Sequence, residues 1–144
     1  MRRLGFLATI IGILSQSQTA QACVDYYVQA PNLNYQPQLM SSTSAVTTIN
    51  ITRFTCPNPV YLRVSQGKSL SYQKRYMDNG NHRLQYNFYV QPTSASAVWG
   101  DGTGGTYRQQ ISGVTSINLY TIVEPQQDIV PGAYSDSINI QFAP

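Results

Sequence analysis

Two segments of the chain alternate strictly between apolar and polar side chains. In residues 82–90 every second residue is apolar, and these residues are Leu84, Tyr86, Phe88 and Val90. In residues 131–142 the same period places Tyr134, Ile138, Ile140 and Phe142 on one face. A period of two residues predicts half-buried β-strands. Asp136 lies on the apolar face of the second segment, so it needs a polar partner or a wet end of the strand.

Shorter strands are predicted elsewhere, separated by turn residues. Leu62 and Val64 face inward in the segment 60–64, and a bulge near Thr52-Arg53 reconciles the two apolar faces of the segment 45–56. The other expected strands cover residues 24–29, 72–77, 106–111 and 117–123. Residues 23–144 show no sustained helical periodicity. Seven or eight short strands predict an all-β protein with an antiparallel sandwich or barrel.

Residues 1–22 have the composition of a secretory signal peptide. Arg2 and Arg3 precede an apolar run of about 11 residues, and a small-residue cleavage site ends at Ala22. The run is too short to cross a bilayer, so we expect no membrane span. We expect a cleaved leader over 1–22 and one exported domain over 23–144. Lipidation of Cys23 stays an alternative, although Ala20 stands where a lipobox has Leu.

The charge balance argues against nucleic-acid binding, and the cysteine content predicts a disulfide. Basic and acidic side chains almost balance once the leader is removed, and no basic patch indicates nucleic-acid binding. The chain has two cysteines, Cys23 and Cys56. An even count in an exported protein predicts one disulfide, which by chain entropy is worth about 3–4 kcal/mol. Two free buried thiols are the alternative.

Residue patterns for catalysis and cofactor binding are absent from the sequence. His82 is the sole histidine and has no acidic partner at motif spacing, and the glycine-rich segment 100–105 lacks the lysine of a phosphate loop. Asp101 alone does not make a calcium loop. We therefore expect no enzyme activity, no cofactor and no metal. Trp99 is interpreted as a core residue, with a sugar-stacking platform as the alternative, and the charges of Lys74, Arg75 and Arg83 as solvated.

Several motifs together resemble the spore coat U domain family, which includes pilus subunits of the archaic chaperone–usher type. Arg75-Tyr76-Met77 resembles its R-x-M segment, and Cys23 and Cys56 match its paired cysteines. The segment 120–124 departs from the family, which has Gly and Arg after the Tyr. The remaining matches are Leu84, Tyr86 and Tyr89 in the central strand, Trp99, Gly100, Asp101 and Gly102 in the turn, and Gly132, Tyr134 and Asp136 in the closing strand.

The resemblance implies an immunoglobulin-like antiparallel β-sandwich that lacks its last strand. A periplasmic chaperone, an usher and neighbouring pilin subunits are the implied partners, and a role in adhesion and biofilm at the cell surface follows. Strand phase suggests that the groove for the added strand is bordered by Ile138, Ile140 and Phe142, with Leu62 and Val64 contributing. Cleavage before Cys23 leaves no donor strand, which favours a terminal position or a non-polymerising member. The alternative is a stand-alone secreted coat or carbohydrate-binding protein with a complete sandwich.

Overall fold

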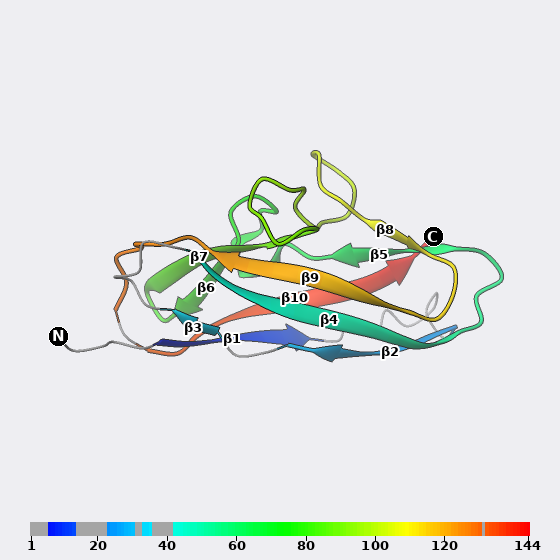
Figure 1. The fold of residues 1–144 in the computed structure, drawn as a ribbon, viewed down its shortest axis with the longest axis horizontal. Coiled ribbons are helices and arrows are strands. Elements are labelled where there is room, and N and C mark those ends of the chain that lie inside the picture. The colour runs from blue at the N-terminus through cyan, green and yellow to red at the C-terminus, as the bar shows by residue number, and fades with distance from the viewer. Residues whose placement is uncertain (1–5, 14–22, 31–32, 36–41, 131) are drawn as a thin grey trace.

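The structure is a computed structural model that describes residues 6–13, 23–30, 33–35, 42–130 and 132–144. Strands dominate it (Figure 1). The described elements, in chain order, are β1 (Phe6–Ile13), β2 (Val24–Gln29), β3 (Leu33–Tyr35), β4 (Thr43–Phe54), β5 (Val60–Val64), the 3-10 helix η1 (Gly67–Ser69), β6 (Tyr76–Asn79), β7 (His82–Tyr89), β8 (Gln109–Ile111), β9 (Thr115–Val123) and β10 (Tyr134–Ala143).

Strand pairing follows one path, in the order β2-β4-β9-β7-β6-β10-β1-β3, and β5 pairs with both β10 and β8. Every pairing is antiparallel except that of β1 with β10. The link between β6 and β10 is a single pair, Asp78 with Ser135. The predicted all-β antiparallel fold is confirmed, while the immunoglobulin-like sandwich and its missing strand stay predictions.

One hydrophobic core is shared by strands that are far apart in this pairing order, such as β2 and β10. Tyr26 of β2 contacts Phe142 of β10, with ring centroids 4.8 Å apart. The burial pattern alternates along β5 and along most of β10, as the sequence predicted, because a strand directs successive side chains to opposite faces. Burying these apolar side chains is the main favourable term in folding.

The first core strands are joined covalently. Cys23 and Cys56 form a disulfide across the ends of β2 and β4, which confirms the predicted pair. The sulfur of Cys23 therefore cannot also carry a lipid thioether. Beside the disulfide, Asp25 pairs with Arg53 and Tyr26 pairs with Ile51, so Thr52 is the extra residue of a β-bulge. The predicted bulge near Thr52 is confirmed.

Two predicted strands are shorter or shifted. The segment 72–77 becomes a strand only from Tyr76, because the carbonyl of Tyr72 accepts a hydrogen bond from the side chain of Asn87 (2.8 Å) and not from a strand. The segment 106–111 becomes a strand only from Gln109. Tyr107 instead closes the glycine-rich turn, donating its N–H to the carbonyl of Val98 (2.8 Å).

Candidate functional site: the edge of strand β10

Strand β10 has different partners along its two edges. On one edge its C-terminal half pairs with β5, from Ile140 opposite Val64 to Ala143 opposite Tyr61. On the other edge its N-terminal half pairs in parallel with β1, from Tyr134 to Asn139. Figure 1 shows β1 running beside β10 at this edge. The segment predicted to be a cleaved leader thus supplies the strand that covers this edge.

Backbone hydrogen bonds fix which groups of β10 point to which edge. The carbonyl of Asn139 accepts from the N–H of Ser65 (3.0 Å), and the N–H of Asn139 donates to the Ser65 hydroxyl (2.8 Å). Backbone groups alternate along a strand. Those of Ile138 and Ile140 therefore point to the β1 edge. Pairing with β1 ends at Asn139, and the described residues place no other strand on this edge beyond it.

The predicted groove residues lie together under this edge. In the register of β10 with β5, Ile140 is opposite Val64 and Phe142 is opposite Leu62. All of these side chains and that of Ile138 are buried in the shared core. A strand at the β1 edge of β10 is therefore positioned to cover apolar side chains as well as backbone groups.

Asp136, which the sequence placed on the apolar face, is buried and fully engaged. Its Oδ2 accepts a hydrogen bond from the hydroxyl of Tyr86 (2.6 Å), and its Oδ1 accepts from the N–H groups of Lys68 (2.9 Å) and Ser137 (2.8 Å). Gly67 makes this approach possible, since its φ is +71° and an added Cβ would lie 2.4 Å from Oδ2. The predicted need for a polar partner is confirmed.

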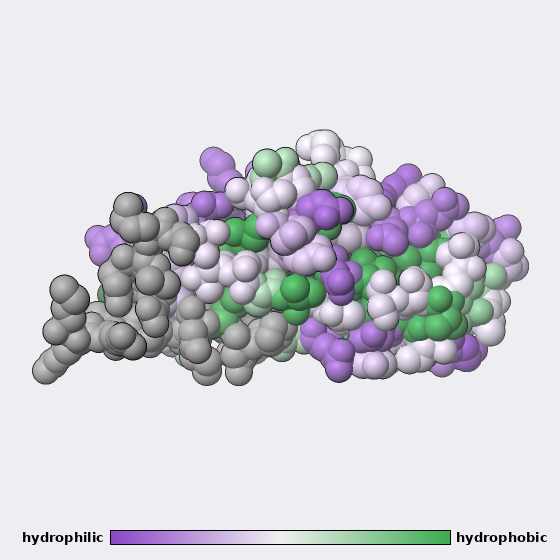
Figure 2. Space-filling model, viewed as in Figure 1, coloured by the Kyte–Doolittle hydropathy of each residue, from purple (hydrophilic) through white to green (hydrophobic). Residues whose placement is uncertain are grey.

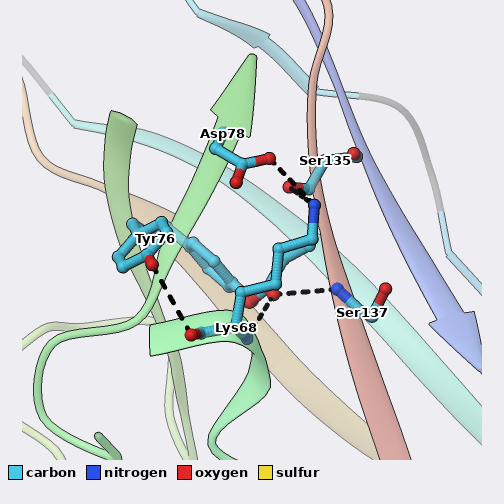
Figure 3. Close-up of polar contacts among 7 residues, drawn as sticks. Lys68, Tyr76, Asp78, Ser135 and Ser137 are labelled. Atoms are coloured by element: carbon cyan, nitrogen blue, oxygen red, sulfur yellow. Dashed lines mark hydrogen bonds and ion pairs between the residues drawn. The ribbon is translucent and has the colours of Figure 1, made fainter. Parts of the chain in front are cut away.

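A second set of contacts ties η1 to β6 and β10 on the outside of this carboxylate (Figure 3). The ammonium of Lys68 pairs with Asp78 (2.8 Å) and donates to the carbonyl of Ser135 (3.3 Å). The hydroxyl of Tyr76 lies 3.5 Å from the carbonyl of Lys68. These contacts hold the loop that follows β5 against the covered part of β10.

Arg75 corrects the sequence interpretation, which assigned it a solvated charge. Its side chain is fully buried. The guanidinium donates to the carbonyls of Ser65 (3.0 Å from Nε) and Val64 (3.3 Å) and to the side-chain oxygen of Asn87 (2.7 Å). A buried cation requires such partners. Period-two spacing from the buried Met77 puts Arg75 on the inward face, and this was the signal that sequence reasoning overlooked.

Burial and mutual charge shift the protonation of this buried network. Loss of water lowers the pKa of Arg75 to about 10, against the opposing influence of Tyr86 and Asp136. Loss of water, and then the negative charge of Asp136, raise the pKa of Tyr86 well above its ordinary value. Around neutral pH the network therefore contains a cationic arginine and a neutral tyrosine. The tyrosine hydroxyl donates a hydrogen bond to the side chain of Asp136.

Comparison with known proteins gives the family. A model of the Spore Coat Protein U domain matches residues 12–141. The chain belongs to this family. Among solved structures it is similar to one described as the CsuC-CsuE chaperone-tip adhesion subunit pre-assembly complex from archaic chaperone-usher Csu pili of Acinetobacter baumannii. The identity is 20%, the TM-score is 0.46, and the match covers 83% of this chain but only 39% of that one. No curated protein matches.

The residues that carry the Spore Coat Protein U resemblance have structural positions. Trp99 is buried and meets Tyr107 edge to face, with ring centroids 4.9 Å apart, so the sugar-stacking alternative is wrong for this ring. Gly100 leaves no room for a side chain, because an added Cβ would lie 2.5 Å from Thr106. Gly102 has a positive φ of 91°. Asp101 accepts the N–H of Thr103 (2.9 Å), which closes the turn.

The strand residues of the motif belong mostly to the core. Leu84, Tyr86 and Tyr134 are buried, and Tyr89 is half-buried. The hydroxyl of Tyr134 donates to the carbonyl of Val130 (2.5 Å), which anchors the start of β10 just after Gly132. The motif residues of these strands therefore have structural positions in or beside the core.

The residues that the structure describes contain neither metal-ligand clusters nor membrane-spanning helices. They contain no group of three or more potential metal ligands. They also contain no helix that is long and apolar enough to cross a membrane. Figure 2 shows one face of the molecule, on which polar side chains predominate and apolar ones lie between them.

Proposed function

We propose that this protein is an exported, non-enzymatic subunit of an archaic chaperone–usher type pilus or a related cell-surface assembly. The observation that carries the proposal is the pairing of β10 with β1, because β1 lies within the segment predicted to be a cleaved leader. Membership of the Spore Coat Protein U domain family supports it. The domain of residues 23–144 would then need a strand from another chain.

Removal of β1 would leave an edge that the folded domain cannot repair alone. The backbone groups of Ile138 would lose their partner, and the core beside Ile140 would lose its cover. An open, apolar strand edge pairs readily with other chains, so it is both an aggregation hazard and a binding site. Adding one strand satisfies the backbone and buries apolar side chains at the same time.

The proposed partners follow from this requirement. A periplasmic chaperone would supply the first strand, and an usher would replace it with a strand from a neighbouring subunit. The parallel direction of β1 supports an edge that accepts a parallel strand. The subunit would pass from the periplasm to the cell surface, where the assembly would take part in attachment and biofilm formation.

The discriminating experiment uses the domain of residues 23–144, produced under oxidising conditions. It is measured by size-exclusion chromatography and thermal unfolding, alone and with a synthetic peptide of residues 6–13. A peptide of the same sequence with Ile11→Pro is the control, since proline at this position removes a backbone donor that faces β10. We expect aggregation alone, a stable monomer with the first peptide, and no rescue by the second.

A stable monomer that ignores both peptides would overturn the proposal. That result would favour the alternative of a stand-alone secreted coat or binding protein, whose core is complete without a partner. Rescue by both peptides equally would show that apolar contact, and not strand pairing, protects the domain.

A further inference from the structure

A polar cavity of about 280 Å³ lies on the outward face of the β5–β10 pair. Arg63 on β5 and Asn139 and Gln141 on β10 line it, and all three alternate with buried core residues. Tyr72 and Asp101 complete the lining from the two loops that flank β5. Val64 and Ser65 also line the cavity, and their carbonyls accept hydrogen bonds from Arg75, so the cavity adjoins the buried network although β1 does not line it.

The loop wall of the cavity is held in place. Gly100 accepts the N–H of Val64 (3.0 Å), which docks the glycine-rich turn against β5. Asp101 accepts from the N–H and the hydroxyl of Thr103 (2.9 and 2.5 Å), and a hydrogen bond from Tyr72 also lowers the pKa of its carboxyl. The acceptor positions of this carboxylate are thus largely occupied. Tyr72 brings an aromatic ring to the same wall.

Arg63 contributes a positive charge to the cavity. Its Nη2 donates to the carbonyl of Pro144 (3.0 Å), whereas its Nε is buried with no hydrogen-bond partner among the described residues. The other ion pairs of the described chain join Arg53 to Asp25 and Lys68 to Asp78. Because Nε is closed to solvent, a ligand in the cavity meets the positive charge of Arg63 at the terminal nitrogens of its guanidinium.

We propose that this cavity binds a sugar carboxylate of monosaccharide size, such as a uronic acid residue of an acidic polysaccharide. The carboxylate faces the guanidinium of Arg63, whose charge favours a charge-assisted hydrogen bond from its terminal nitrogens. Side-chain amides at 139 and 141 both donate and accept, which matches hydroxyl groups that do the same. The ring of Tyr72 offers a surface to the apolar C–H groups of the sugar.

Other ligand classes fit less well. The cavity volume is near the lower limit of about 300 Å³ for small-molecule sites, which suits one sugar ring. A phosphate group carries a charge of about −1.5 to −2 at pH 7, more than the single cation of Arg63 balances beside the Asp101 carboxylate, whereas a uronate carries one negative charge. A neutral sugar makes no use of the charge of Arg63. The proposal does not rest on strand addition, because the two sites lie on opposite faces of β10.

Binding is tested on the full 144-residue chain, folded with its disulfide formed. Glucuronate and galacturonate are titrated by calorimetry and by ligand-observed NMR, with glucuronate methyl ester, glucose and acetate as comparison probes. We expect saturable binding of the uronates. The methyl ester, glucose and acetate should each bind at least about tenfold more weakly, a difference of about 1.4 kcal/mol.

Two variants test the assigned contacts. Arg63→Gln should weaken uronate binding at least about tenfold without changing the weak affinity for glucose. Gln141→Ala should weaken both the uronates and the methyl ester by a smaller factor. Arg83→Gln is the control, since Arg83 is exposed over the ring of Tyr76 (4.3 Å) and does not line the cavity. Near-ultraviolet circular dichroism checks that each variant is folded.

Three results would overturn the proposal. Unchanged uronate affinity in both Arg63→Gln and Gln141→Ala would exclude the cavity. Acetate binding as tightly as the uronates would reduce the site to a carboxylate contact with no sugar recognition. Absence of saturation with every probe would show that the cavity is not a saccharide site. None of these results bears on whether β10 accepts a strand.

Discussion

The β4–β9 pairing and the β10–β1 pairing are built from similar strands but have different consequences. β4 and β9 form an antiparallel ladder of nine residue pairs, from Thr43 opposite Val123 to Ile51 opposite Thr115. β10 and β1 form a parallel ladder of six pairs, from Tyr134 to Asn139. Both strands of the first ladder lie inside the predicted mature domain, whereas one strand of the second lies in the predicted leader.

The stability of the sheet and the completeness of its edge therefore depend on different strand pairings. The first ladder is flanked by β2 and β7, so both of its strands have partners on each side. In the second ladder, loss of β1 leaves backbone groups of β10 facing solvent. Under the proposal, such a domain would retain most of its core and still lack a stable folded monomer. Four perturbations, described in order of decreasing effect, test the comparison.

The largest effect is expected from a proline in β1. The backbone groups of Asp136 and Ile138 point to the β1 edge, so the N–H of Ile11 faces β10, and Ile11→Pro in the full chain removes a donor from the parallel ladder. The variant should lose its soluble monomer in size-exclusion chromatography. Gln18→Pro, outside β1, should leave the monomer intact. A monomeric Ile11→Pro chain would show that the β1 pairing is dispensable.

Loss of the buried cation should destabilise the β10 side strongly. Arg75→Ala leaves the carbonyl of Ser65 and the oxygen of Asn87 without their donor, and it removes the positive charge that balances Asp136. Removing one partner of such a buried charge network costs about 3–5 kcal/mol. Urea unfolding measures the loss. Arg83→Ala is the matched control, and equal losses in the two variants would contradict the buried role of Arg75.

Loss of the disulfide should destabilise the β2–β4 side of the sheet, away from the β10 edge. Replacing Cys23 and Cys56 with Ser is expected to lower the free energy of unfolding by about 3–4 kcal/mol, since the bond restricts the unfolded chain. The β10 edge does not depend on this bond, so the domain of residues 23–144 should still bind the peptide of residues 6–13. Loss of peptide binding in the folded variant would couple the two regions and weaken the comparison.

The smallest effect is expected in alkali. Burial raises the pKa of Tyr26 and, further, that of Tyr86, so the unfolded chain ionises first and stability falls as pH rises above about 10. Arg75 opposes this, because its lowered pKa makes the unfolded chain bind more protons above about pH 10. Urea unfolding between about pH 8 and pH 11 should show a net loss. Tyr86→Phe should reduce the slope, and an unchanged slope would contradict its assignment.

The strand pattern was the most predictable part of the fold. Period-two alternation identified β5, β7, β9 and β10 together with the inward phase of Ile138 and Leu62, because burial on one face leaves a direct record in sequence. The bulge at Thr52 was predictable for the same reason. The ends of β6 and β8 were not, because side chains and a turn take their backbone hydrogen bonds.

The candidate site was predictable only where strand phase determined it. Strand phase placed Asp136 on the inward face, with a polar partner or a wet strand end as alternatives, but its partners in η1 and β7 are far apart in sequence. Arg75 was misassigned because its charge was given more weight than its position in the alternating pattern of the strand. The cavity beside Arg63 was beyond sequence reasoning, since it depends on how two loops fold over β5.

The long-range pairing of β4 with β9 also determines how late the sheet can form during folding. Even its nearest partners, Ile51 and Thr115, are separated by most of the domain, whereas β6 and β7 are joined by the two-residue turn Gly80-Asn81. A ribosome delivers β4 well before β9, and β10 arrives last. Folds dominated by such distant pairings form in milliseconds to seconds, against microseconds for a hairpin. During that interval unpaired strand edges persist, and they can pair with other chains before the sheet is complete.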